Sequence, residues 1–232
     1  MFINGFDILW DEIDDYVADI KSIRSIDQFM FTKPVTFFCG ENGSGKSTLL
    51  EALAIKNGLN PEGGTRNYNF STYDSYSNLH KHMRLWRSRK PDWMYFLRAE
   101  SFYNVATKEM EYSGVFSERY HDQSHGQSFF SVLMKQTNKN GLYLLDEPEA
   151  ALSCQNQLAL LYLIQSCVKQ NCQFIIATHS PILLGFPGAQ ILSFDEDKVE
   201  EVDYKSTSSY QTMKLFLDRY DYFVEDIKEN EI

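Results

Sequence analysis

Residues 40–47 have the residue types and spacing of a loop that binds phosphate groups. They read Gly-Glu-Asn-Gly-Ser-Gly-Lys-Ser, which fits the pattern G-x-x-x-x-G-K-[S/T]. Glycines let the backbone turn tightly, so that successive N–H groups can point inward at phosphate oxygens. Lys46 would reach the β- and γ-phosphates of a nucleoside triphosphate, and the Ser47 hydroxyl would be a ligand of Mg²⁺. We therefore predict a site for ATP and Mg²⁺ whose nucleotide-binding residues are Gly40, Glu41, Asn42, Gly43, Ser44, Gly45, Lys46, Ser47 and Thr48.

Two carboxylates follow another apolar run and suit the metal ion and an attacking water. The run 142–145 is followed directly by Asp146 and Glu147. Ligands of parallel α/β sheets bind beyond the carboxyl ends of the strands, where this pair would lie. Asp146 would be a second ligand of Mg²⁺, and Glu147 would be the general base that takes a proton from water. Two acids can also simply end a strand at the surface, but the loop upstream favours the catalytic interpretation.

A histidine follows a third apolar run, 174–177, in the segment Thr178-His179-Ser180. A lone histidine is usually structural. Here the strand before it is predicted to lie next to the strand that ends in the acids, so that the imidazole could hydrogen-bond the γ-phosphate. The predicted catalytic residues are therefore Lys46, Glu147 and His179.

The apolar runs around these residues predict a mainly parallel sheet. Continuous apolar runs are typical of strands that are buried on both faces. Helical patterns alternate with them, and the segment 155–169 would bury Leu158, Leu161, Ile164 and Val168. Alternating strands and helices indicate an α/β fold with crossover connections. The predicted strands are 35–39, 93–97, 142–145 and 174–177, and the predicted helices are 47–55 and 155–169.

Other segments add smaller parts to this expected fold. Residues 191–194 and 199–204, separated by an acidic turn, predict an antiparallel β portion in the form of a hairpin. Residues 210–227 predict one or two closing helices. The polar segment 57–90 predicts an irregular and helical layer over the nucleotide site. We find no repeat or linker and expect a single domain, 1–232, that contains a helical or irregular insert at about 57–92.

The composition is that of a packed globular protein, with 43% hydrophobic and 15% aromatic residues among 232. A net charge of −10 disfavours a protein that coats nucleic acid or anionic lipid over its whole surface. The basic stretch 80–90 is either a solvated helix face or a local binding patch. The four cysteines form neither a zinc nor a disulfide pattern, and no signal peptide or membrane span is evident. We therefore expect a cytoplasmic protein with no direct membrane insertion.

Between the phosphate loop and the acidic pair, residues 123–127 read Gln-Ser-His-Gly-Gln. With the phosphate loop, the acidic pair and the histidine, this set resembles the ABC-type ATPases, in which this segment is the signature usually written LSGGQ. Ser124, Gly126 and Gln127 match it. The resemblance implies a P-loop NTPase fold of ABC-ATPase type with a small helical subdomain and a signature region at about 101–135. It also implies that Ser124, Gly126 and Gln127 bind the nucleotide of a second copy, in a head-to-tail homodimer that hydrolyses two sandwiched ATP molecules.

The sequence departs from this family at two positions. Glu100 lies where the family usually has the glutamine that contacts Mg²⁺ or its water, and is our third candidate metal ligand. Ser153 lies where the family often has aspartate, in the loop that couples the two ATP sites of the dimer. Trp10 and Tyr16 are candidates for stacking on adenine, although each is also well explained as packing.

The whole chain resembles compact ATPases related to the RecF and SMC head proteins of DNA maintenance. This resemblance favours an ATP hydrolase that serves DNA maintenance or defence. Two alternatives remain open. The first is a nucleotide-gated module that controls a DNA or protein effector, and the second is the cytoplasmic ATPase subunit of an ABC transporter.

Overall fold

The computed structural model describes residues 1–65, 76–98, 133–134, 137 and 140–229, and its largest element is a six-stranded sheet. The first five strands are mutually parallel, and the last pairs antiparallel with its neighbour. The predicted parallel sheet and hairpin are therefore confirmed. The strand order is β5 (Trp93–Arg98), β6 (Gly141–Asp146), β7 (Gln173–Ala177), β3 (Val35–Cys39), β8 (Gln190–Ser193) and β9 (Glu200–Glu201).

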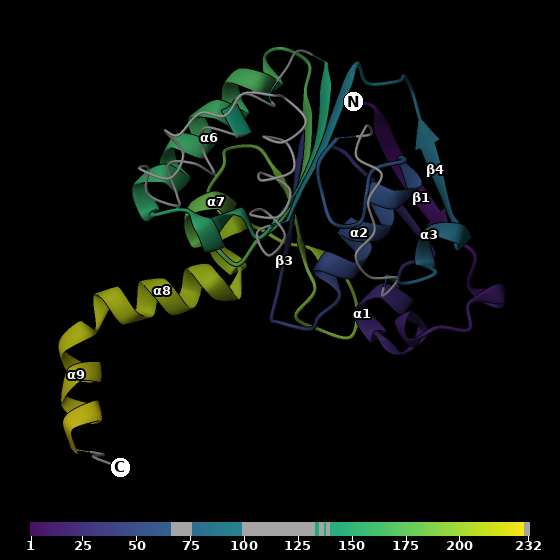
Figure 1. Cartoon of the computed structure of the whole chain (residues 1–232). Coiled ribbons are helices and arrows are strands. Elements are labelled where there is room, and N and C mark those ends of the chain that lie inside the picture. The colour runs from purple at the N-terminus through teal and green to yellow at the C-terminus, as the bar shows by residue number, and fades with distance from the viewer. Residues whose placement is uncertain (66–75, 99–132, 135–136, 138–139, 230–232) are drawn as a thin grey trace.

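Helices cover both faces of this sheet, with α2 (Lys46–Lys56) on one side and α6 (Cys154–Val168) on the other (Figure 1). Successive residues of a strand point to opposite faces. Phe38 accordingly joins the core on the α2 side, and Phe37 joins the core on the α6 side. The sheet is thus buried on both faces, as its unbroken apolar runs predict.

The inward face of α6 differs from the predicted one. The predicted stripe included Leu158, which is 49% exposed. Gln157 is buried instead, and its side chain donates to the Leu152 carbonyl at 3.0 Å and accepts from the Ser180 hydroxyl at 2.6 Å. These bonds orient the helix about its axis, so that its fully buried face is Gln157, Leu160, Ile164 and Cys167.

A second sheet, of three antiparallel strands, covers α2 from outside (Figure 1). Its order is β2 (Gln28–Met30), β1 (Ile3–Ile8) and β4 (Met83–Arg87). The prediction that residues 57–90 form an irregular and helical layer over the nucleotide site was therefore wrong for the end of that segment. There α3 (Leu79–His82) leads directly into β4, whose inward Met83 and Leu85 pack on the α2-side core. Arginines alternate with these apolar residues and mask the strand pattern.

Two buried glutamines fasten the two sheets together. Gln173, at the start of β7, accepts from the backbone N–H groups of Phe2 and Ile3 and donates to the Ile3 carbonyl. Gln190, at the start of β8, accepts from the N–H of Thr32 and donates to the Met30 carbonyl. Each amide satisfies backbone groups that would otherwise be buried without partners.

The chain continues into two helices, α8 (Ser208–Asp218) and α9 (Tyr220–Glu229). The prediction of one or two helices at 210–227 is confirmed, but the helices project away from the body as an arm and do not close over it as expected (Figure 1). No helix in the described part of the chain is long and apolar enough to cross a bilayer. The remaining short helices are α1 (Lys21–Arg24), α7 (Pro181–Leu184) and the 3-10 helices Trp10–Glu12, Tyr16–Asp19, Pro148–Ala151 and Tyr204–Ser206.

Candidate functional site

The site lies at the carboxyl ends of the parallel strands, where the loop after β3 leads into α2. Gly40, Gly43 and Gly45 all have positive φ, at 137°, 80° and 98°, in the left-handed region that side chains other than hydrogen disfavour. A Cβ on Gly45 would also lie 2.8 Å from Ile23 of α1. The loop therefore curls as its glycines predict and presents the first N–H groups of α2, which have no partners within the helix.

Lys46 is folded into this loop. Its ammonium donates to the carbonyls of Gly40 and Glu41, each at 2.7 Å, and the residue is only 3% exposed. Burial lowers the pKa of Lys46, and the nearby carboxylates of Glu147 and Asp146 oppose that shift. The lysine is thus a sheltered cation beside the strand-end acids, in the position that a phosphate group requires.

Ser47 and Asp146 meet as the sequence predicts, since the serine hydroxyl donates to Asp146 Oδ1 at 2.8 Å. The other oxygen of Asp146 lies 3.6 Å from Nε of Arg98, at the end of β5. Arg98 also forms a 2.6 Å ion pair with Glu51 of α2. We did not predict Arg98 or Glu51 from the sequence. The available signal was the place of Arg98 at the end of a buried strand, where a charge must find a partner.

Glu147 and His179 lie together at the ends of the adjacent strands β6 and β7. Nε2 of His179 is 3.3 Å from Oε1 of Glu147, and the two side chains are 35% and 38% exposed. Glu147 has φ of 48°, a left-handed conformation that is uncommon for a residue with a side chain. A strained backbone of this kind is often retained where a side chain must be aimed at a reacting group.

Glu149, which we did not predict, fixes the turn that carries His179. Its Oε1 accepts from the Thr178 hydroxyl at 2.7 Å and from the backbone N–H groups of His179 and Ser180 at 2.5 and 3.2 Å. The only sequence signal is a third acid, two residues after Glu147. Its role depends on a contact across about thirty residues, which local patterns do not reveal.

Asp195, also not predicted, connects the phosphate loop to the arm. Its Oδ1 accepts from the backbone N–H of Glu41 at 2.9 Å, and its Oδ2 accepts from the hydroxyl of Ser208, at the start of α8, at 3.1 Å. A groove of about 500 Å³ runs beside this contact. Its walls are Gly40, Glu41 and His179 of the site and apolar residues of the arm, including Met213, Phe216 and Phe223.

Several predicted site residues lie outside the part of the chain that the structure describes. These are Glu100 and the signature residues Ser124, Gly126 and Gln127. Trp10 and Tyr16 are described: the Trp10 indole donates to the Ile26 carbonyl and packs against Arg24, and Tyr16 is 52% exposed. Ser153 caps the start of α6 by accepting from the N–H of Asn156.

The donors at the site suit Mg²⁺ that arrives with a nucleotide. Among the described residues, no group of three or more His, Cys, Asp or Glu side chains is placed to hold a metal ion by itself. Mg²⁺ is usually held by one or two protein oxygens together with waters and substrate phosphates. Ser47 and Asp146, whose oxygens are already adjacent, are the residues that would hold it.

Comparison with known proteins identifies the kind of protein that has these motifs. An "AAA domain" family model matches residues 17–83, and an "AAA ATPase domain" model matches residues 125–184. An uncharacterized ABC transporter ATP-binding protein from Haemophilus influenzae is 28% identical over 183 residues, which are 68% of each chain. Over these segments the chain is similar to ATPase domains and to an ABC-type ATP-binding protein. The strand, glycine-rich loop and helix at residues 35–56, together with the mainly parallel sheet, give the chain a P-loop NTPase fold.

Two solved structures align with most of the chain at low similarity. A cassette from Clostridium perfringens that is part of an ABC transporter complex is 17% identical, covers 97% of this chain and 100% of its own, and has a TM-score of 0.44. The SMC head domain from Thermotoga maritima is 13% identical, covers 87% of this chain and 98% of its own, and has a TM-score of 0.43.

Proposed function

We propose that this protein hydrolyses ATP to ADP and phosphate at the loop 40–47. The observation that carries the proposal is the meeting of three strand ends: Ser47 bonds Asp146, and Glu147 faces His179, around one phosphate-binding loop. These are the positions for metal ligands, a base and a γ-phosphate sensor that phosphoryl transfer to water requires.

In the proposed reaction, a water oxygen bonds to the γ-phosphorus while the bridging bond to the β-phosphate breaks. Glu147 takes the proton from that water, and Lys46 and the loop N–H groups stabilise the charge that develops on the phosphate oxygens. His179 donates a hydrogen bond to the γ-phosphate. Its proximity to Glu147 supports this assignment, because a group at that position can respond to both the base and the phosphate. Mg²⁺ held by Ser47 and Asp146 would offset the charge of the phosphates.

We further propose that a second copy of the chain completes the site. The signature-like residues Ser124, Gly126 and Gln127 would then bind the γ-phosphate held by the partner, head to tail. The groove between the phosphate loop and the arm supports this proposal, because a copy that covers the loop must also cover the apolar walls beside it. Phe216 and Met213 on those walls are 41% and 46% exposed. Burial of such side chains is the main favourable contribution to association.

The first test uses Glu147→Gln, which removes the base and keeps the shape of the side chain. We expect this variant to bind ATP without turnover and to accumulate as a dimer with Mg-ATP, but not without it, in size-exclusion chromatography with light scattering. Adding Ser124→Arg should abolish that dimer. If Glu147→Gln binds ATP and remains monomeric, the composite site is wrong. If the variant hydrolyses ATP at the original rate, Glu147 is not the base.

We also propose which cellular process this ATPase serves. We favour DNA maintenance or defence, because the motifs resemble those of RecF and SMC heads. A transporter subunit is the main alternative, and the similarity to an ABC transporter ATP-binding protein of Haemophilus influenzae supports it. Affinity purification from solubilised membranes separates the two, since recovery of a stoichiometric membrane-spanning partner would favour transport. The second alternative is a module in which slow ATP hydrolysis only sets how long an effector stays bound. In that case the Glu147→Gln variant would capture its partner in an ATP-dependent manner.

A further inference from the structure

Strand β4 of the three-stranded sheet and the connection from β4 to β5 carry exposed cations that the nucleotide site does not use. Arg84 and Arg87 belong to β4, and Arg89 and Lys90 lie in the connection from β4 to β5; all four residues are exposed. We call these four residues the basic strip. Helix α2 begins at the phosphate loop and ends beside the strip, so its eleven residues separate the two by about 16 Å.

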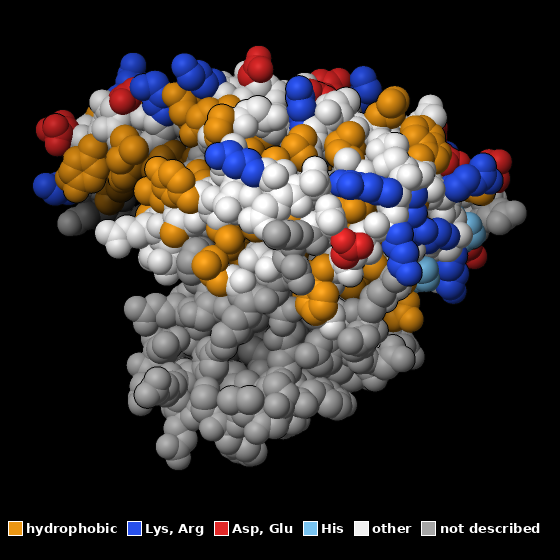
Figure 2. All heavy atoms as spheres, turned by 90° about the horizontal axis from the view of Figure 1, so that it is seen from above, with side chains coloured by type: hydrophobic (Ala, Val, Ile, Leu, Met, Phe, Trp, Pro, Cys, Tyr) orange, Lys and Arg blue, Asp and Glu red, His pale blue; other side chains and the backbone are white. Residues whose placement is uncertain are grey.

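Carboxylates do not neutralise most of this strip. Arg84 lies 3.7 Å from Asp7, whose other oxygen accepts from the Trp86 indole. Within the described residues, Arg87, Arg89 and Lys90 form no ion pair with an acid. The protein as a whole has a net charge of −10, so an unneutralised group of cations is a local exception. Figure 2 shows Lys and Arg side chains spread over this face of the molecule, with some Asp and Glu side chains between them and at its edges.

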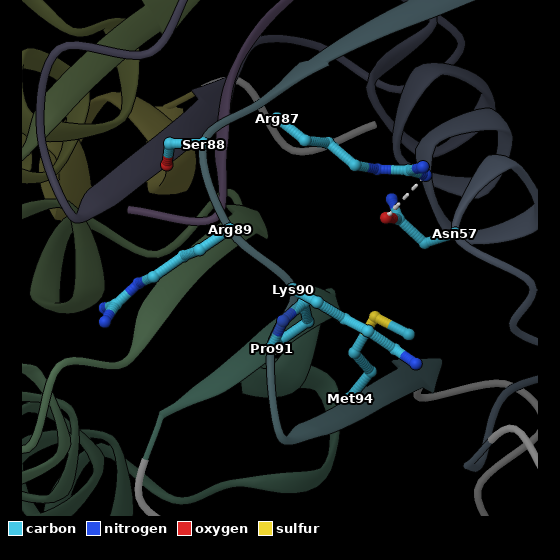
Figure 3. Close-up of a pocket in the computed structure, with 7 residues that line it drawn as sticks. All are labelled: Asn57, Arg87, Ser88, Arg89, Lys90, Pro91 and Met94. Carbon is cyan, nitrogen blue, oxygen red and sulfur yellow. Dashed lines mark hydrogen bonds between the residues drawn. The ribbon is translucent and has the colours of Figure 1, made fainter.

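The two central arginines are held in place by neutral partners. Arg87 donates to the Lys56 carbonyl at 3.0 Å and to Asn57 Oδ1 at 3.2 Å, at the end of α2. Arg89 points the other way, donates to the Asn171 carbonyl at 3.4 Å and lies over the Phe2 ring at 4.5 Å (Figure 3). A guanidinium has five N–H groups, so each arginine retains donors for an anion. Neutral partners orient these side chains and leave their charge unpaired.

A hollow of about 410 Å³ lies among these side chains. Arg87 and Lys90 reach along its sides, Met94 lies beneath Lys90, and Asn57 closes the far side (Figure 3). The hollow is open to solvent, and its lining combines three cations with the polar Asn57 and Ser88 and the apolar Pro91 and Met94. Its charged groups are hydrogen-bond donors with positive charge, which suit a phosphate oxyanion.

The spacing of the four cations along the chain indicates what kind of anion fits. From Arg84 to Lys90 the chain advances six residues, at most about 20 Å at the rise of an extended strand. Phosphates follow one another every 3.4 Å of axis along one strand of a duplex, so about six lie within that length. Cations that are spread along such a length of chain can contact several phosphates of one backbone, which a single small anion does not offer.

We propose that the basic strip binds the phosphodiester backbone of nucleic acid, independently of base sequence. Its contacts are charge-assisted hydrogen bonds from Arg84, Arg87, Arg89 and Lys90 to phosphate oxygens. Such binding releases counterions, so the affinity falls as salt rises, with a slope of about −0.9 per phosphate neutralised on duplex DNA. Four contacts give a slope of about −3.6. The strip is separate from the loop 40–47, so this proposal holds or fails independently of ATP hydrolysis.

The test is the binding of a fluorescent 20-base-pair DNA duplex, followed by anisotropy from about 50 to 200 mM salt. The variant Arg89→Glu/Lys90→Glu reverses two charges of the strip. The control variant Lys198→Glu/Lys205→Glu makes the same change in net charge at two exposed lysines near β9. We expect the strip variant to lower the affinity at least ~10-fold and to reduce the salt slope by about 2, while the control changes the affinity less than about 2-fold.

A second variant and a second ligand keep the proposal falsifiable. Arg89→Gln/Lys90→Gln should show an intermediate loss, and unchanged circular dichroism and melting temperature would show that the variants fold. Binding of a single-stranded RNA of the same length tests whether the strip binds an RNA backbone as well as a DNA backbone. Equal losses in the strip and control variants would overturn the proposal. So would absence of DNA binding at low salt, or strip-dependent binding to phosphatidylserine vesicles without binding to DNA.

Discussion

At the carboxyl end of the six-stranded sheet, where α2 begins, charged groups are paired and largely sheltered, whereas on the basic strip, beside the other end of α2, they are exposed, and three of the four cations have no acid partner among the described residues. The Asp146 and Glu51 side chains are 8% and 13% exposed and share Arg98. The Arg84 side chain, on the basic strip, is 69% exposed. A buried charge needs a partner because desolvation otherwise opposes folding, while an exposed charge is stabilised by water and remains available to a ligand. The two ends therefore respond differently to substitution.

The largest expected contrast is in nucleotide binding. Lys46→Ala should reduce ATP affinity and turnover by at least about 100-fold, because it removes the buried cation that faces the phosphates. Lys90→Ala should change both by less than 2-fold. Titration with a fluorescent ATP analogue and a steady-state assay of phosphate release measure the two quantities. Equal effects of the two substitutions would mean that the nucleotide does not bind at the loop 40–47.

The second contrast is in stability, at the turn that carries His179. Glu149→Ala leaves the Thr178 hydroxyl and two backbone N–H groups without their acceptor, and should lower the free energy of unfolding by about 2–4 kcal/mol. Glu149→Gln keeps one acceptor oxygen and should cost about half as much. Urea unfolding of both variants tests this order. Turnover should fall with Ala and be largely retained with Gln, and the reverse order would contradict the positioning role.

The third prediction concerns the apolar arm beside the nucleotide site. Phe216→Ser, on the wall of the groove, should weaken the ATP-dependent dimer of the Glu147→Gln protein by about 10-fold, because truncating a central apolar anchor typically costs more than 1 kcal/mol. Ile227, which is 69% exposed and does not line the groove, is the matched control. Sedimentation equilibrium gives both affinities. A similar loss with Ile227→Ser would indicate that the arm acts by general hydrophobicity.

The smallest expected effect is in the pH dependence of stability. Burial raises the pKa of Glu51 above its ordinary value of 4.5, although Arg98 opposes this shift. A raised carboxyl pKa in the folded state contributes stability that is fully present below 4.5 and lost as pH rises through the folded pKa. Glu51→Gln should therefore flatten the fall in stability just above pH 4.5. Urea unfolding at several pH values measures this slope, and an unchanged slope would show that Arg98 fully compensates the burial of Glu51.

The strength of local patterns explains which elements could be predicted. The strand before residue 40, the loop and α2 follow one another in sequence, so glycine geometry and an apolar run suffice to define them. Strand β4 has arginines between its apolar residues and pairs with β1, from the distant start of the chain. Its identity as a strand depends on that partner, because strand preference is largely a matter of packing on neighbouring strands.

The sequence by itself determined the phosphate loop, the acids that end β6 and the strands and helices next to them, because each depends on residues close together in the chain. Only the tertiary structure decided that Glu149 fixes the His179 turn, that Asp195 connects the loop to the arm, and that the cations before β5 form an unneutralised strip. These roles arise from contacts between distant segments. A hydrogen bond or an ion pair depends on which groups meet in space, and a single sequence does not record that.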